Sequence, residues 1–211
     1  MFWKIYRSVY ICLLIGQMSK AEQTKAFIIE RTAPVFNRKG YAGTSMSDLT
    51  AATGLTKGSI YGNFQDKDAV ALAAFDFNLK KVTSLFSAEI GRENSFREKL
   101  LVYVRLYSRF QKYPFPEGGC PVMNTGIESD DTHPALRAKA ADALVAWKNQ
   151  ITDLVRKGVK NGEFKKVKDP EQAGLTILAL IEGATMISGT TGNPSYRSAI
   201  MRSLKTMIEE F

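Results

Sequence analysis

The strongest constraint on the fold is the spacing of apolar residues, which recur every three or four positions along most of the chain. This spacing places them on one face of an α-helix, whereas few stretches show the alternation of a half-buried β-strand. In the first such segment, Ile29, Ala33 and Phe36 share one face, and Gly40 then ends the helix. Hydrophobic residues make up 45% and charged residues 24% of the chain, as in soluble globular proteins. We therefore expect an all-α fold.

Residues that cap or open helices predict where each helix begins. Ser45, Thr56 and Asp66 have side chains that accept hydrogen bonds from the free N–H groups of a first helical turn. Asp169 can do the same, with Pro170 in the first helical position. These signals predict about nine helices, over residues 20–39, 46–53, 57–64, 67–90, 96–113, 124–127, 134–161, 170–188 and 194–211.

The expected helices are short before Asp66 and long after it, so the sequence predicts two domains, over residues 18–66 and 67–211. Residues 1–17 form a separate segment, and their apolar run is too short to span a bilayer. Three interpretations of this segment stay open. It is an in-frame extension upstream of Met18 that is foreign to the natural protein, an extra packed helix, or a membrane or export signal.

The most informative stretch runs from Gly43 to Lys67. Two short helices are expected there, joined by a turn that contains Gly54, a residue type that tolerates positive φ. Leu49, Leu55 and Ile60 supply the apolar contacts that fix the angle between the two helices. This is the plan of a helix-turn-helix, whose second helix enters the major groove of DNA.

The second short helix carries the small, polar and basic residues that contact with DNA requires. Lys57 can reach a phosphate or a guanine edge, and Gly58 lets the backbone approach the groove closely. The net charge of +8 suits a polyanionic partner without proving one. We expect DNA contacts from both helices and from the start of the next one, at Thr44, Ser45, Met46, Thr56, Lys57, Gly58, Ser59, Tyr61, Gly62, Asn63 and Lys67.

This stretch resembles the N-terminal domain of the TetR-type (tetracycline-repressor-like) family. The residues that carry the resemblance are Phe36, Gly40-Tyr41, Thr44-Ser45, Asp48-Leu49, Gly54-Leu55, Lys57-Gly58-Ser59-Ile60-Tyr61, Phe64 and Lys67-Asp68. The resemblance implies a homodimeric transcriptional regulator, usually a repressor, which a small ligand releases from a palindromic operator in double-stranded DNA. The chain departs from the family at Thr50 and Thr53, where alanine is usual. We expect Thr50 to face the contact between the two short helices.

In the second domain the resemblance is weaker, and the expectations rest on residue patterns. The two last helices are candidates for a dimer interface, because Ala173–Ile187 is rich in small and apolar residues and the final helix carries Ile200, Leu204, Met207 and Ile208 at helical spacing. A pocket for an unknown small-molecule effector would lie between the long helices, unless the aromatic residues there are simply core. Its candidate lining residues are Tyr103, Tyr107, Phe110, Cys120, Met123 and Trp147.

Other classes of function find little support in the sequence. It contains no phosphate-binding loop and no nucleophile elbow, so we expect no enzymatic activity and no cofactor. The single histidine, His133, is more simply a helix cap than a metal ligand, since further ligands are missing. Two cysteines, Cys12 and Cys120, are too few for a disulfide scaffold and fit a reducing cytoplasm. One alternative stays open: a DNA-binding regulator that responds to a protein partner or to redox state through Cys120.

Overall fold

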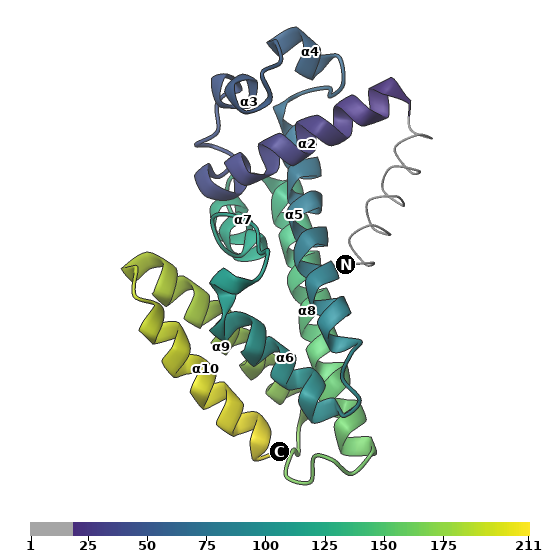
Figure 1. The fold of residues 1–211 in the computed structure, drawn as a ribbon, viewed down its shortest axis with the longest axis vertical. Coiled ribbons are helices and arrows are strands. Elements are labelled where there is room, and N and C mark those ends of the chain that lie inside the picture. The colour runs from purple at the N-terminus through teal and green to yellow at the C-terminus, as the bar shows by residue number, and fades with distance from the viewer. Residues whose placement is uncertain (1–18) are drawn as a thin grey trace, which may run out of the picture. The chain divides into compact units, whose positions relative to one another are not determined.

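The computed structural model describes residues 19–211, so the three interpretations of residues 1–17 lie outside the described part of the chain (Figure 1). The described part contains nine α-helices, one 3-10 helix and no strand, which confirms the predicted fold class. The elements are α2 (Lys20–Lys39), α3 (Met46–Thr53), α4 (Lys57–Tyr61), α5 (Lys67–Ile90), α6 (Phe96–Ser108), η1 (Phe110–Lys112), α7 (Pro121–Ser129), α8 (Pro134–Lys160), α9 (Pro170–Thr191) and α10 (Pro194–Glu209).

Most helices begin where the capping residues predicted. The caps at Ser45 and Thr56 are present, and the Asp66 carboxylate accepts a hydrogen bond from the Ala69 N–H at 2.7 Å. Two helices are shorter than expected, because α4 already ends at Tyr61 and α6 at Ser108. Residue 113, the predicted end of α6, has extended backbone angles, which the proline that follows it favours.

The chain divides into two compact units between Phe77 and Asn78, inside the continuous helix α5. The boundary predicted at residue 66 lies immediately before the same helix and stays a prediction. The first unit contains α2, α3, α4 and the first part of α5 (Figure 1). Its core is built from side chains without exposed surface, including Ile28, Ala33, Leu49, Ile60 and Val70. This core joins the two short helices to the longer ones.

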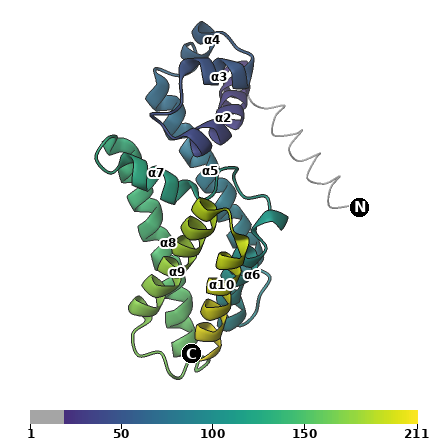
Figure 2. The same cartoon turned by 90° about the vertical axis from the view of Figure 1, so that its left-hand side faces the viewer.

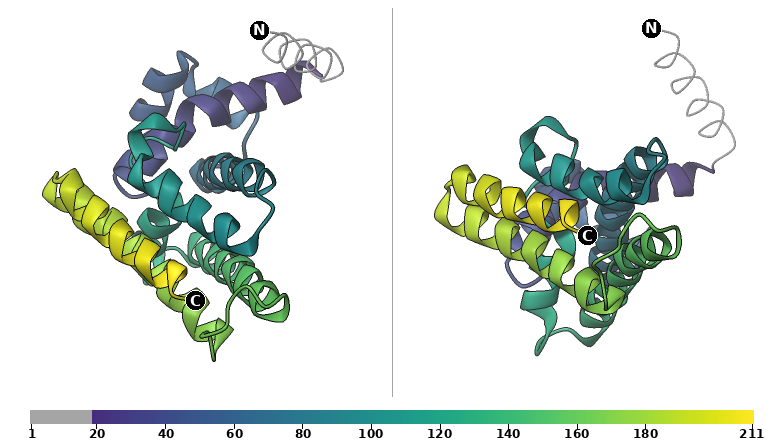
Figure 3. Two further views of the ribbon diagram at one scale, coloured as in Figure 1. Left: turned by 60° about the horizontal axis from the view of Figure 1, so that its bottom comes forward. Right: turned by 90° about the horizontal axis from the view of Figure 1, so that it is seen from below.

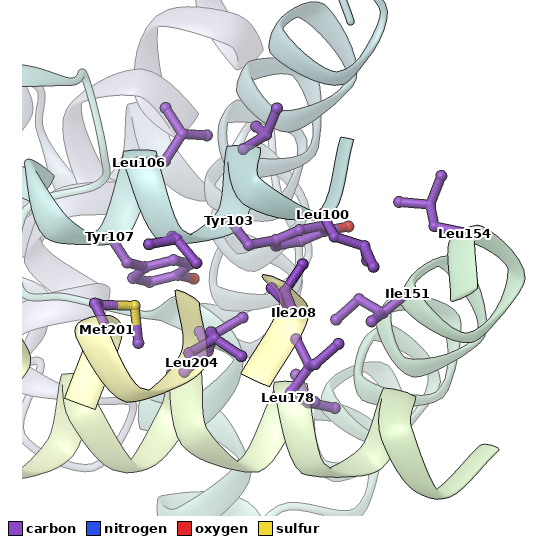
Figure 4. Close-up of a cluster of buried hydrophobic side chains, with 14 of the residues drawn as sticks. Leu100, Tyr103, Leu106, Tyr107, Ile151, Leu154, Leu178, Met201, Leu204 and Ile208 are labelled. Carbon is purple, nitrogen blue, oxygen red and sulfur yellow. The ribbon is translucent and has the colours of Figure 1, made fainter. Parts of the chain in front are cut away.

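The second unit contains the rest of α5 and the helices from α6 to α10. Helices α9 and α10 run beside each other in opposite directions (Figures 2 and 3), and α6 packs on α8 and α10. Figure 4 shows how side chains from four helices meet in the core between them. Those labelled are Leu100, Tyr103, Leu106, Tyr107, Ile151, Leu154, Leu178, Met201, Leu204 and Ile208.

The packing of α10 corrects one expectation about the dimer interface. Leu204 and Ile208 have no exposed surface in the single chain, so they belong to the core of the second unit. The small residues of α9 lie in two different environments. A Cβ atom on Gly174 would lie 2.2 Å from the Thr152 Oγ1 atom of α8, so Gly174 permits close packing inside the chain. Gly183, in contrast, has open space around it.

Among the described residues, α9 is also the one helix that is long and apolar enough to cross a membrane. One face of this helix, which includes Ile177 and Ile181, packs in the core of the second unit. The apolar character of α9 therefore has a structural explanation in the folded chain.

Candidate functional site

Capping residues and one glycine fix the turn between α3 and α4. Ser45 and Asp48 cap α3 reciprocally: the Ser45 Oγ accepts from the Asp48 N–H at 3.2 Å, and the Asp48 carboxylate accepts from the Ser45 N–H at 2.9 Å. The Thr56 Oγ1 accepts from the Ser59 N–H at 3.2 Å and so caps α4. Between the helices, Gly54 has φ 70° and ψ 7°. Glycine adopts this left-handed conformation without steric strain.

Buried contacts hold the two short helices at a fixed angle. Leu49 of α3 and Ile60 of α4 have no exposed surface. The buried Thr53 hydroxyl donates to the Leu49 carbonyl at 2.7 Å and accepts from the Leu55 N–H at 3.2 Å. Thr50, which we expected at this contact, is only half-buried. The polar residue that stabilises the turn is therefore Thr53.

The outer surface of α4 is polar, basic and accessible. Its exposed residues, with the N-cap and C-cap, are Thr56, Lys57, Gly58 and Gly62, while Ser59 and Tyr61 are half-buried. The Lys57 Nζ atom lies 5.7 Å from the centre of the Tyr61 ring. A cation–π contact at an exposed site contributes only ~0.5–1 kcal/mol. The Lys57 ammonium therefore remains available to a binding partner.

Gly58 is notable because nothing among residues 19–211 requires a glycine there. A Cβ atom on Gly58 would meet nothing closer than the Thr56 Oγ1 atom, at 4.0 Å, and Gly58 is not among the glycines with positive φ. Glycine inside a helix lowers stability by roughly 0.5–1 kcal/mol relative to alanine. The described residues therefore give no internal reason for this glycine, and its missing side chain leaves the backbone of α4 open to a partner.

Besides the caps Ser45 and Thr56, the predicted DNA-contacting residues Thr44 and Asn63 also form hydrogen bonds within the protein. Thr44 is 1% exposed, and its hydroxyl donates to the Gly40 carbonyl at 2.6 Å. The Asn63 side-chain amide donates to the Ser59 carbonyl at 2.9 Å. These hydrogen bonds close the connection between α2 and α3 and the end of α4. For Thr44 and Asn63 the structure therefore provides a local role, and their contact with DNA stays a prediction.

The first turn of α5 is attached to the connection between α2 and α3. The Tyr41 hydroxyl donates to the Asp68 carboxylate, and this hydrogen bond is the main reason why the pKa of Tyr41 rises to about 12. The Lys67 Nζ atom lies 4.2 Å from the centre of the Tyr41 ring. A contact of this kind contributes only ~0.5–1 kcal/mol at an exposed site, so the Lys67 ammonium remains available to an anion.

The second unit contains an apolar cavity of about 120 Å³ between α5, the start of α7 and α8. Its wall is formed mainly by aliphatic and aromatic side chains. The lining residues are Leu79, Val82, Thr83, Phe86, Cys120, Pro121, Val122, Ala143, Ala146, Trp147 and Gln150. A cavity of this kind binds small molecules chiefly by removing apolar surface from water.

Two of the six residues predicted to line a pocket, Cys120 and Trp147, line this cavity. Tyr103 and Tyr107 lie one layer deeper in the core. Their ring centres are 4.9 Å and 5.8 Å from that of Phe86, which itself lines the cavity. The two tyrosines therefore support the wall of the cavity from behind.

Phe110 and Met123, the other aromatic and sulfur candidates, are not among the lining residues. The wall contributed by α5, with Leu79, Val82 and Phe86, was missed in the sequence. Their helical spacing is the only sequence signal, and it is the same for a residue that faces a cavity and one that faces packed core.

Cys120 is buried and hydrogen-bonded on both sides. Its Sγ atom donates to the Glu182 Oε1 atom at 3.3 Å and accepts from the Met123 N–H at 3.5 Å. Burial and the neighbouring Glu182 carboxyl raise the pKa of the thiol well above its usual value. A thiol that stays protonated is a poor nucleophile. The structure therefore does not favour the alternative of redox sensing through Cys120.

His133 is the N-cap of α8, as expected, and its Nδ1 atom accepts from the Leu136 N–H at 3.2 Å. Within residues 19–211, no three histidine, cysteine or acidic side chains are grouped so that they could hold a metal ion.

Two protein-family models match the chain. The model described as bacterial regulatory proteins, tetR family, matches residues 28–74, which include α3 and α4. The model for the tetracyclin repressor-like C-terminal domain matches residues 97–204. The chain belongs to the TetR family. It is therefore a DNA-binding transcriptional regulator and not an enzyme.

Individual relatives agree with this TetR-family assignment. A solved TetR-family transcriptional regulator from Cytophaga hutchinsonii is 48% identical, with a TM-score of 0.87 over 92% of this chain and 96% of that one. The A-factor receptor protein of Streptomyces griseus is 32% identical over 175 residues, which cover 82% of this chain and 58% of the relative. The transcriptional repressor DhaR of Mycobacterium sp. (strain GP1) is 23% identical over 168 residues, 75% of this chain and 79% of DhaR.

Proposed function

We propose that the protein is a homodimeric repressor that reads an inverted-repeat operator with α4 and leaves it when a small molecule occupies the cavity beside α5. The observation that carries this proposal is the α3–turn–α4 unit, in which two capped helices present an exposed polar and basic surface. The second helix of such a unit lies in the major groove with its N-terminal residues at the base edges. The protein then acts in the cytoplasm, on double-stranded DNA.

The contacts divide by chemistry. Lys57 reaches a phosphate or the acceptor atoms of guanine, and the hydroxyl groups of Ser59 and Tyr61 reach phosphates. Lys67 and Ser45 contact the DNA backbone from the two flanking helices. Phosphate contacts position the protein on the duplex, while only contacts to base edges specify the sequence.

The exposed face of α9 supports the homodimer. Leu175 is 51% exposed, Met186 46% and Ile187 37%, and Ala179 and Gly183 lie between them on the helix. A row of exposed apolar side chains indicates an interface with another molecule. A second copy of α9 and α10 covers this face in the proposed dimer. The dimer then presents two recognition helices to half-sites ~34–36 Å apart or a multiple of it.

The continuity of α5 supports control by an effector. This helix begins with Lys67, next to the proposed DNA-contacting helix, and its later turns line the cavity with Leu79, Val82 and Phe86. A ligand that fits one position of α5 better than another shifts the protein toward that position. The name of the A-factor receptor also supports a ligand-binding role among relatives.

The test is fluorescence anisotropy of the purified protein on DNA from upstream of its own gene, against scrambled DNA, at fixed near-physiological salt. Preferential binding of two protomers to an inverted repeat is the expected result. Lys57→Ala should weaken binding to both DNAs and lower the slope of log Kd against log salt by about two, because each of the two protomers loses one phosphate contact. An unchanged slope would remove Lys57 from the phosphate contacts.

A matched pair of variants tests the dimer. Leu175→Glu places a charge on the exposed face of α9, whereas Val145→Glu makes the same change at a 56% exposed position of α8. Analytical ultracentrifugation should give monomers for Leu175→Glu and dimers for Val145→Glu, since an unpaired charge is costly only where an interface buries it. Dimers of both variants would place the interface elsewhere.

A further inference from the structure

We propose that the cavity between α5, α7 and α8 accepts one compact, uncharged, ring-sized apolar molecule and excludes charged and drug-sized molecules. This rests on the proposed function only in calling that molecule the effector. The inference follows from three properties of the cavity wall: its volume, its lack of charge and the rigidity of its aromatic side.

The volume sets the size of the ligand. The cavity measures about 120 Å³, whereas pockets for drug-sized ligands measure roughly 300–1,000 Å³. An engineered apolar cavity of about 150 Å³ in another protein stays free of water and binds benzene. A single six-membered ring with one small substituent therefore matches the space, and two fused rings with side chains exceed it.

The wall offers no partner for a charge. None of the described residues that line the cavity carries a formal charge at neutral pH. The buried polar group of the wall is the Cys120 thiol, which already donates to Glu182 and accepts from Met123. An ionic group inside the cavity would therefore lose its hydration without gaining a partner, which is strongly unfavourable.

The exposed lining residues Thr83, Ala146 and Gln150 lie at the solvent side of the cavity. The Thr83 hydroxyl already donates to the Lys80 carbonyl at 3.2 Å, within its own helix. The amide of Gln150 is a neutral polar group at this mouth for a substituent of the ligand. The site thus accepts a hydroxyl or carbonyl substituent at its mouth and an apolar ring inside.

The aromatic side of the wall is held in place by stacked rings. The Phe86 ring lies 4.9 Å from that of Tyr103 and 5.9 Å from that of Trp147, measured between ring centres. Tyr103 and Tyr107 are buried and pack behind it. Because this side cannot collapse or move outward easily, the cavity keeps its shape and presents ring faces to a planar ligand.

The experiment compares three probes that share one ring and differ in charge: toluene, benzoate and the benzylammonium ion. Trp147 lines the cavity and Trp3 is the only other tryptophan, so the full chain with Trp3→Phe reports ligand binding through Trp147 fluorescence. Toluene should change the emission saturably and raise Tm. Benzoate and benzylammonium should bind at least about 100-fold more weakly. Equal affinity of either ion, or no saturable change with toluene, would overturn the inference.

Variants of α8 locate the binding site. Ala143 lines the cavity and is buried, so Ala143→Leu fills the space and should weaken toluene binding at least about 10-fold. Ala141→Leu adds the same volume to the same helix at an exposed position outside the lining, and should leave affinity unchanged. Ala146→Leu at the mouth serves as the second variant if Ala143→Leu does not fold. Unchanged affinity in the cavity variants would place the bound toluene elsewhere.

Adding operator DNA separates this inference from the proposed function. If toluene binds as described but the protein stays on DNA, the ligand class stands and effector release is wrong. If a charged molecule releases the DNA and competes with toluene, effector release stands and the ligand class is wrong. If toluene binds and releases DNA from the wild type but not from Ala143→Leu, both stand.

Discussion

Replacing Gly58 by alanine should separate the stability of the protein from its affinity for DNA. A methyl group at this position has open space, with its nearest neighbour at 4.0 Å, and the backbone does not require glycine. Alanine in place of glycine within a helix raises stability by about 0.5–1 kcal/mol. For a chain of this length that corresponds to an increase in Tm of roughly 1–4 °C.

The same methyl group should weaken the complex with DNA. If the α4 backbone lies close to the wall of the groove, the added carbon overpacks the interface in each protomer, which typically costs about 1–3 kcal/mol. Affinity then falls about 5- to 150-fold per contact. Because Gly58→Ala changes no charge, the slope of log Kd against log salt should stay that of the wild type, unlike in Lys57→Ala.

The assay combines thermal unfolding with anisotropy on operator DNA at several salt concentrations. Gly126→Ala in α7 is the control, because a Cβ there also meets nothing closer than 3.8 Å and its backbone has no positive φ. This control should gain stability and keep its affinity for DNA. Gly58→Ala with increased Tm and wild-type affinity would refute the close approach of α4 to the groove.

Three further predictions follow from the second unit. Gly158→Ala should lower the free energy of unfolding, measured in urea titrations, by about 1–3 kcal/mol, because the added Cβ would lie 2.1 Å from the buried Phe164 ring. Wild-type stability of this variant would contradict that packing. Burial raises the pKa of Glu182 from 4.5 to about 7, so its ionisation is less favourable in the folded protein and stability falls as the pH rises between these values. Between about pH 5 and about pH 8, the free energy of unfolding of Glu182→Gln should therefore decrease by about 2 to 3 kcal/mol less than that of the wild type. Parallel profiles of unfolding free energy against pH for the two proteins would contradict this prediction. In a Cys12→Ser background, Cys120 should react with iodoacetamide at neutral pH at least about 100-fold more slowly in the folded than in the denatured protein. Rapid labelling of the folded protein would restore redox sensing as an alternative.

The helix-turn-helix could be predicted from the sequence because its determinants are local. Each cap acts within three residues, as Ser45 does on Asp48 and Thr56 on Ser59, and the turn depends on one glycine. Local hydrogen bonds and backbone preferences are encoded in neighbouring residues, so the sequence alone indicates where α3 ends and α4 begins.

The cavity could not be predicted in the same way, because it is the space left between helices that are far apart in the sequence. Val82, Cys120 and Trp147 meet there from three helix segments. Aromatic composition therefore suggested Tyr103 and Tyr107, which instead support the wall. The apolar row of α10 shows the same limit, since helical spacing identifies a buried face without telling whether the same chain or a second copy buries it.

Glycine illustrates why residue type alone does not reveal a role. Gly54 is needed for its left-handed backbone, and Gly158 for the space that the Phe164 ring occupies. Gly58 has neither reason, because its surroundings are open and its φ is not positive. The sequence suggested the roles of Gly54 and Gly58 from their places in the helix-turn-helix, whereas the role of Gly158 follows only from its contact with Phe164 in the structure. Gly58 is distinguished from other glycines with open surroundings, such as Gly126, by its place in the helix proposed to enter the groove, where a partner is expected.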